Sequence, residues 1–206
     1  MSQIALPLDT ASSGDDEGYV VTPANLLIHE QLQNWKEWPN RIALLIGPAS
    51  SGKTAMACAF KRMSNGRILE NADAVSDDAL FHAWNEAKEA DEALLLVSSK
   101  PVSEWGIILP DLQSRLAASQ LLEIGPPDEA MMEGILQKYF AARGLSVSQD
   151  ALAYLAKRME RSYSNIQYLA RKLDNLAIVR QKPVNRSIAR EVMEQVRSET
   201  ERPDES

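Results

Sequence analysis

Eight consecutive residues, 47–54, carry the clearest chemistry in the sequence. They read Gly-Pro-Ala-Ser-Ser-Gly-Lys-Thr and match the pattern G-x-x-x-x-G-K-[ST] at every fixed position. Glycines let the backbone approach phosphates, and loop amides at a helix N-terminus supply positive partial charge. The Lys53 ammonium adds a full charge near the outer phosphates, and the Thr54 hydroxyl can ligate Mg²⁺. The loop predicts a site for a purine nucleotide, ADP or ATP with Mg²⁺, formed by Gly47, Pro48, Ala49, Ser50, Ser51, Gly52, Lys53 and Thr54.

Hydrolysis of a bound nucleotide needs groups beyond this loop. It usually requires two carboxylates at the end of a neighbouring strand, one that holds Mg²⁺ and one that orients water. The segment Ile-Leu-Glu-Asn-Ala-Asp at 68–73 offers Glu70 as a nucleotide and metal ligand, but it places Asn71 where the second carboxylate is expected. Asn71 cannot act as a base, and Glu70 and Asp73 are equally compatible with surface acids. We therefore expect weak or absent intrinsic ATPase activity.

A sheet must position these groups, and the apolar pattern supplies one. The runs Ile42–Ile46 and 93–97 are typical of buried strands, with further candidates at 67–69 and 120–124. Helical patterns separate these strands, for example at 54–63 and 76–89. Strands that alternate with helices predict an α/β domain whose parallel sheet has helices on both faces.

The pattern changes after the Gly-Pro-Pro at 125–127. Only helical patterns follow, and Ser148, Ser164 and Asn185 are expected to cap three of them. The sequence therefore predicts a flexible tail at 1–18, an α/β nucleotide-binding domain at 19–124, a small all-helical lid domain at 125–197 and a loose tail at 198–206.

The bulk composition narrows the class of protein. A net charge of −7 argues against a chain that grips nucleic acid over its whole surface, although a local basic patch is still allowed. Apolar residues make up 45% of the chain, yet no run approaches the roughly 20 residues that a membrane span needs. The single cysteine, Cys58, cannot form an intramolecular disulfide. We expect a soluble, cytoplasmic protein that does not bind membranes.

The phosphate loop, the two-domain pattern and several short segments resemble the Hda-like regulators of the DnaA-related AAA+ family. The most specific segment after the loop is Leu-Pro-Asp-Leu-Gln-Ser-Arg-Leu at 109–116. The resemblance implies that Arg115 is an arginine finger, which would stabilise transition-state charge in trans on ATP held by DnaA. A surface arginine that completes a salt bridge is the alternative.

The N-terminal residues 3–8, Gln-Ile-Ala-Leu-Pro-Leu, are similar to the peptide by which such regulators dock on a sliding clamp. An extended segment can insert its apolar side chains into a groove while the glutamine amide fixes the orientation. The resemblance therefore implies two partners, the β sliding clamp of DNA polymerase III and DnaA, and a homodimer stays open. The clamp-binding candidates are Gln3, Ile4, Leu6, Pro7 and Leu8.

Four further nucleotide-site candidates follow from the resemblance. Tyr19 either stacks on the base or covers the core, and Ser98 ends the strand that carries the family's first nucleotide sensor. In the helix with the second sensor, Gln167 stands where the family has arginine, and Arg171 lies one turn further along the same helix face.

Two departures from the family matter. Only 13 residues separate Thr54 from Ile68, where the family has an additional strand and helix, so that unit or the carboxylate strand itself is missing. No helix-turn-helix domain follows the lid, so direct sequence-specific DNA binding is not expected. A P-loop kinase and a clamp-loader or initiator-like ATPase subunit are the alternatives to a regulator of replication initiation.

Overall fold

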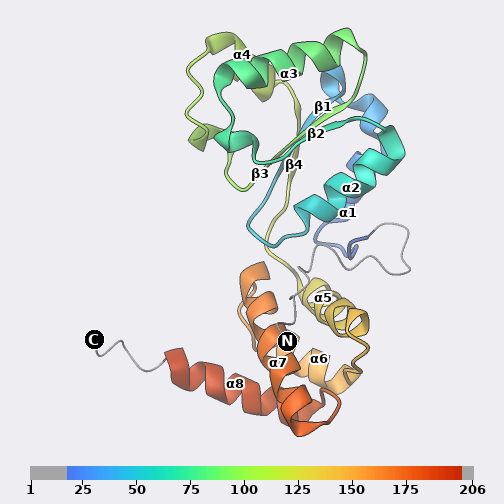
Figure 1. The fold of residues 1–206 in the computed structure, drawn as a ribbon, viewed down its shortest axis with the longest axis vertical. Coiled ribbons are helices and arrows are strands. Elements are labelled where there is room, and N and C mark those ends of the chain that lie inside the picture. The colour runs from blue at the N-terminus through green and yellow to red at the C-terminus, as the bar shows by residue number, and fades with distance from the viewer. Residues whose placement is uncertain (1–17, 201–206) are drawn as a thin grey trace, which may run out of the picture. The chain divides into compact units, whose positions relative to one another are not determined.

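The structure is a computed structural model, and it describes residues 18–200. These residues form two compact units that divide between Gly125 and Pro126. We call residues 18–125 the α/β unit and residues 126–200 the helical unit (Figure 1). None of the helices in the described part is long and apolar enough to cross a membrane.

Four parallel strands form the sheet of the α/β unit in the order β2-β3-β1-β4. Their bounds are β1 Ile42–Ile46, β2 Arg67–Leu69, β3 Leu94–Ser98 and β4 Gln120–Glu123. Every residue of β1 and β3 is buried, because these central strands have neighbours on both sides and helices above and below. The predicted parallel sheet with helices on both faces is confirmed.

Side chains that alternate along the strands point to opposite faces of the sheet, and each face packs in its own apolar layer. One layer packs Ile42, Leu44 and Leu96 against helices α3 (Asp77–Glu89) and α4 (Pro110–Ala117). The other face lies toward α1 (Leu26–Gln33) and α2 (Lys53–Ser64), which Figure 1 shows on the opposite side of the sheet. There the Trp38 ring stacks on Phe60, with centroids 5.1 Å apart.

The residues that precede α2 and α3 explain where these two helices begin. Helix α2 starts at Lys53, directly after Gly52, whose φ of 86° is in the left-handed region that favours glycine. Helix α3 is capped by Ser76, whose hydroxyl accepts from the Ala79 amide. The chain thus runs from β1 directly into the phosphate loop and then into α2.

The helical unit contains α5 (Glu129–Ala142), α6 (Gln149–Ala156), α7 (Tyr163–Arg180) and α8 (Arg186–Thr200). Ser148 and Asn185 accept the expected capping hydrogen bonds, but α7 is capped by Ser162 and not by Ser164. A cap residue needs extended backbone angles, and Ser162 has them, whereas Ser164 is already helical. Burial and the Asp128 carboxylate raise the pKa of Tyr163, the first residue of α7, to about 12.

Candidate nucleotide site

The two glycines of the phosphate loop are needed for different reasons. A Cβ atom at Gly47 would lie 2.8 Å from Ile124 Cβ and 3.0 Å from Ser51 Oγ, so there is no room for a side chain. At Gly52 there is open space, and the positive φ is what favours glycine. Packing therefore requires glycine at position 47, and backbone conformation favours glycine at position 52.

Backbone amides of the loop are available to a ligand. The Gly47 amide donates to Ser98 O and the Ser51 amide to Pro48 O, each at 3.3 Å. Within residues 18–200, five other loop amides have no intramolecular acceptor: those of Ala49, Ser50, Gly52, Thr54 and Ala55. Such amides at a helix N-terminus attract anions, and the α2 macrodipole adds to the effect. The loop fits a polyphosphate.

The Lys53 side chain folds back across this loop. Its Nζ donates to Gly47 O at 2.9 Å and to Pro48 O at 2.8 Å, which holds the cation beside the backbone curl. Thr54 follows in the first turn of α2 with an exposed side chain. An ammonium and a hydroxyl at the same helix start can serve the outer phosphates and a hydrated Mg²⁺. Within residues 18–200, no group of three His, Cys, Asp or Glu side chains could hold a metal ion.

Ser51 is the buried residue of the loop. It is 6% exposed, and its Oγ has no hydrogen-bond partner in the described part of the chain. A buried hydroxyl without a partner costs free energy. Ser51 therefore contributes to the loop through its backbone and its small volume rather than through its side-chain hydroxyl.

The end of β3 carries a polar network that local sequence patterns did not predict. Ser98 is buried, and its Oγ lies 2.9 Å from Asp73 Oδ1 and accepts from the Lys100 amide at 2.9 Å. The second Asp73 oxygen lies 3.7 Å from Lys100 Nζ. Asp73 is thus the carboxylate that meets the predicted sensor residue, with a side chain only 14% exposed.

Glu70 lies at the end of β2 and is exposed. Asn71 follows it in a left-handed conformation, with φ 52°, and starts the short 3-10 helix Ala72–Ala74 that turns Asp73 toward Ser98. Strand β2 pairs directly with β3, and the described sheet has no strand beyond it. Sequence reasoning chose Glu70 as a nucleotide and metal ligand, which stays a prediction. It named Asp73 only as an acid three residues further along, because local spacing cannot place that side chain against Ser98.

Tyr19 covers the core of the α/β unit. It is 9% exposed, and its hydroxyl lies 2.9 Å from His29 Nδ1, with the two rings edge to face. Asn25 holds the preceding segment through hydrogen bonds to Val20 O and from the Thr22 amide. Of the two roles considered for Tyr19, this geometry favours packing.

Arg115 is held firmly against α3. Its guanidinium lies 4.5 Å from the centre of the Phe81 ring and 4.6 Å from that of Trp84. It donates to Asn85 Oδ1 at 2.6 Å and pairs with Asp111 at 2.7 Å, which leaves the side chain 25% exposed. These contacts agree with the alternative interpretation, an arginine that completes a salt bridge. To act on a nucleotide of another protein, the guanidinium would have to leave these partners.

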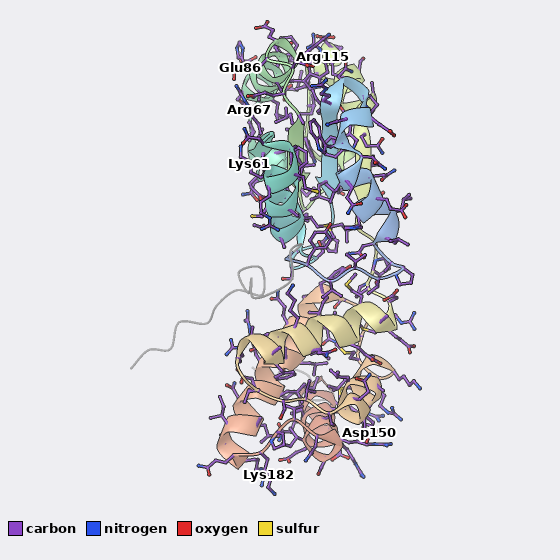
Figure 2. All side chains as sticks on the ribbon, turned by 90° about the vertical axis from the view of Figure 1, so that its right-hand side faces the viewer. Lys61, Arg67, Glu86, Arg115, Asp150 and Lys182 are labelled. Atoms are coloured by element: carbon purple, nitrogen blue, oxygen red, sulfur yellow. The ribbon has the colours of Figure 1, made fainter. Side chains whose placement is uncertain are left out.

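Arg115 lies away from the phosphate loop of its own chain. Asn85 is followed by Glu86, which pairs with Arg67 at the first residue of β2. Figure 2 shows Arg115, Glu86 and Arg67 at one end of the α/β unit. The phosphate loop follows the last residue of the parallel strand β1, at the opposite edge of the sheet. Arg115 and the phosphate loop of the same chain therefore lie at opposite edges of the sheet.

The remaining candidates belong to other parts of the chain. Gln167 is half-buried and Arg171 exposed on α7 of the helical unit, one turn apart. Within the described residues, no acid lies within salt-bridge distance of Arg171. The clamp-binding candidates Gln3, Ile4, Leu6, Pro7 and Leu8 lie outside the described residues.

Comparisons with known proteins agree with this geometry. No family model matches the chain. The chain is 26% identical over 118 residues to the chromosomal replication initiator protein DnaA of Cutibacterium acnes, a match that takes in 57% of this chain and 24% of that protein. The chain therefore spans about a quarter of the length of this relative, to which it is homologous over that part.

Solved structures show the same fold. Domain III of the Thermotoga maritima replication initiation protein DnaA matches with a TM-score of 0.70 at 16% identity, over 87% of this chain and 95% of that one. A replication initiator DnaA bound to AMPPCP and single-stranded DNA matches with a TM-score of 0.58 at 15% identity, over 78% of this chain and 64% of that one. The chain has the AAA+ fold of DnaA domain III.

Proposed function

We propose that this chain is an AAA+ regulator of chromosomal replication initiation that binds ADP or ATP through residues 47–54. The loop itself supports this proposal best: five of its amides have no acceptor within residues 18–200, the Lys53 side chain lies across it, and Gly47 has no room for a Cβ atom. The similarity to DnaA supports the adenine nucleotide and the link to replication. Calorimetry with ADP and ATP, with and without Mg²⁺, tests this step, and no binding heat with either would overturn it.

Within the site, each residue has a proposed task. Loop amides hold the inner phosphates, Lys53 moves from its carbonyl partners to the outer ones, and Thr54 contacts Mg²⁺, which keeps most of its ligands from phosphate and water. Ser98 senses the outer phosphate, and Asp73 orients its hydroxyl. Asn71 supplies no base and Glu70 is exposed, so hydrolysis by the chain alone is weak.

The regulatory step belongs to Arg115. We propose that it acts in trans on ATP held by DnaA, after leaving Asp111 and Asn85. Two features support this: Arg115 lies at the edge of the sheet opposite its own phosphate loop, and one quarter of its side chain is exposed. An arginine finger contributes roughly 10³–10⁵-fold to turnover, so its loss is easily measured.

The test is DnaA–ATP turnover reconstituted with clamp, DNA and this chain. Arg115→Ala is expected to abolish stimulation, and Arg115→Lys to restore little because lysine lacks the planar fork. The matched control is Asp111→Asn, which weakens the present pairing but retains the arginine and should keep stimulation. If Arg115→Ala stimulated turnover as well as the parent chain, the trans role would be wrong.

Residues 3–8 are proposed to tether the chain to the β sliding clamp on DNA, which would raise the local concentration of Arg115 near DnaA. A pull-down on the clamp with Gln3→Ala separates this function from the alternative of an initiator-like or clamp-loader subunit. Loss of binding supports the tether, whereas unchanged binding favours the alternative. A P-loop kinase would be indicated by phosphoryl transfer from ATP to a metabolite.

A further inference from the structure

Charge is divided unequally between the two units. Residues 126–200 contain twelve lysines and arginines and nine aspartates and glutamates, whereas residues 18–125 contain nine and thirteen. The helical unit is therefore basic within a chain whose net charge is −7. Sequence-independent binding of nucleic acid depends on this kind of local excess of cations.

Three of the cationic side chains of the helical unit lie along one face of α8. Arg186, Arg190 and Arg197 follow one another at intervals of four and seven residues, so they lie on the same side of the helix. Eleven residues of helix rise about 16 Å. Successive phosphates of one DNA strand rise about 3.4 Å, so this row matches about five of them.

Helix α6 and the residues after it extend this row. The Arg158 guanidinium lies 4.2 Å from the centre of the Tyr154 ring, and that of Arg186 lies 5.6 Å from it. Lys157 is exposed beside them. Arg158 and Arg186 thus both lie close to one aromatic ring, and guanidinium planes that stack on aromatic rings can receive both phosphates and bases.

Acidic partners on this face are exposed and weakly held. Asp150 pairs with Arg186 at 3.2 Å and Glu194 with Arg190 at 2.8 Å, and all four side chains are more than half exposed. Figure 2 shows Asp150 at the surface of the helical unit. Exposed pairs of this kind contribute little and can be exchanged for a phosphate.

A groove of about 670 Å³ adjoins the row. Its polar lining is Tyr154, Arg158, Glu160, Asn165, Glu194 and Arg197, and its apolar lining is Met159, Leu169, Met193 and Val196. The two arginines can bind phosphates, and the Tyr154 ring and the apolar side chains can receive a base, which every nucleotide of a nucleic acid strand offers.

We propose that the face formed by α6 and α8 binds the phosphodiester backbone of nucleic acid without reading its sequence. The ligand is recognised by charge and stacking, and the face needs neither the phosphate loop nor Arg115. It would hold the helical unit against DNA at which the chain operates.

The test uses the full chain saturated with ADP, so that the phosphate loop is unavailable, and fluorescence anisotropy with a 20-nucleotide oligo(dT) and a 20-base-pair duplex. The parent chain should bind, and binding should weaken steeply between 50 and 200 mM salt, as roughly expected for phosphate contacts. The combined variant Arg186→Gln, Arg190→Gln, Arg197→Gln should lose at least about tenfold in affinity, with the salt slope for the single strand reduced by about 2.

Arg180→Gln is the matched control, because Arg180 pairs with Glu191, which lies off the arginine row of α8. It should bind as the parent does, and Arg158→Gln alone should show a partial loss with an unchanged melting curve. Unchanged binding by the combined variant would overturn the proposal. Equal displacement of the oligonucleotide by polyglutamate of the same charge concentration would also overturn it, in favour of an acidic protein partner.

Discussion

The phosphate loop and the ends of β2 and β3 lie at the same edge of one sheet, but they are built differently. Residues 47–54 are contiguous and offer mainly backbone amides, which any sequence with the right glycines presents. The strand ends join Asp73, Ser98 and Lys100 through side chains from two segments 25 residues apart. A binding site made of backbone amides can be predicted from a short stretch of sequence. A site made of side-chain contacts depends on which strands pair, and the sequence does not show this locally.

The largest effect should come from the loop. Lys53→Ala removes a full charge from the phosphate site, and hydrogen bonds to charged groups contribute about 1.5–3 kcal/mol, so ADP affinity should fall roughly 10- to 150-fold. Calorimetry measures this directly. Lys61→Ala, in the same helix but bonded to the Gly66 carbonyl, is the control and should bind ADP normally. Equal affinities in both variants would mean that the phosphates do not meet Lys53.

A second prediction concerns Arg115, which is also held by side chains from a distant segment. Arg115→Ala removes two cation–π contacts and a part-buried ion pair, so the free energy of unfolding should fall by about 2 kcal/mol. Urea titration provides the measurement. Arg180→Ala, an exposed pair, is the comparison and should change stability by less than about 0.5 kcal/mol. Equal effects would show that the aromatic contacts contribute nothing.

The strand ends give the third prediction. Asp73→Ala leaves the buried Ser98 hydroxyl without this acceptor and should destabilise the fold by about 1–2 kcal/mol. Glu70→Ala removes an exposed side chain and should cost less than about 0.5 kcal/mol. Thermal unfolding of the two variants side by side separates them. If Glu70→Ala proved the more damaging, the stabilising role assigned to the Asp73–Ser98 hydrogen bond would be wrong.

The smallest effect on stability is expected at Ser51, the buried residue of the phosphate loop. Ser51→Ala removes a buried hydroxyl that has no partner among the described residues, so stability should rise by about 0.5–1 kcal/mol while ADP affinity stays the same. Denaturant unfolding and calorimetry on one preparation measure both. A loss of ADP affinity would show that the Ser51 hydroxyl takes part in binding after all, and the loop would then not depend on backbone alone.

Sequence reasoning located the buried strands and most helix caps because each depends on a few adjacent residues. It placed the cap of α7 two residues too far along, at Ser164 instead of Ser162, because the surrounding packing selects the backbone angles that a cap needs. It also could not decide between packing and base stacking for Tyr19, because its partner His29 is ten residues away.

The sequence by itself determined the phosphate loop, since its glycines, lysine and strand-to-helix context are all local. Only the tertiary structure decided that Asp73 meets Ser98, that Arg115 lies against Phe81 and Trp84, and that Arg186 of α8 lies beside Tyr154 of α6. The physical reason is that backbone amides are positioned by neighbouring residues, whereas charged side chains find partners only after strands and helices have packed.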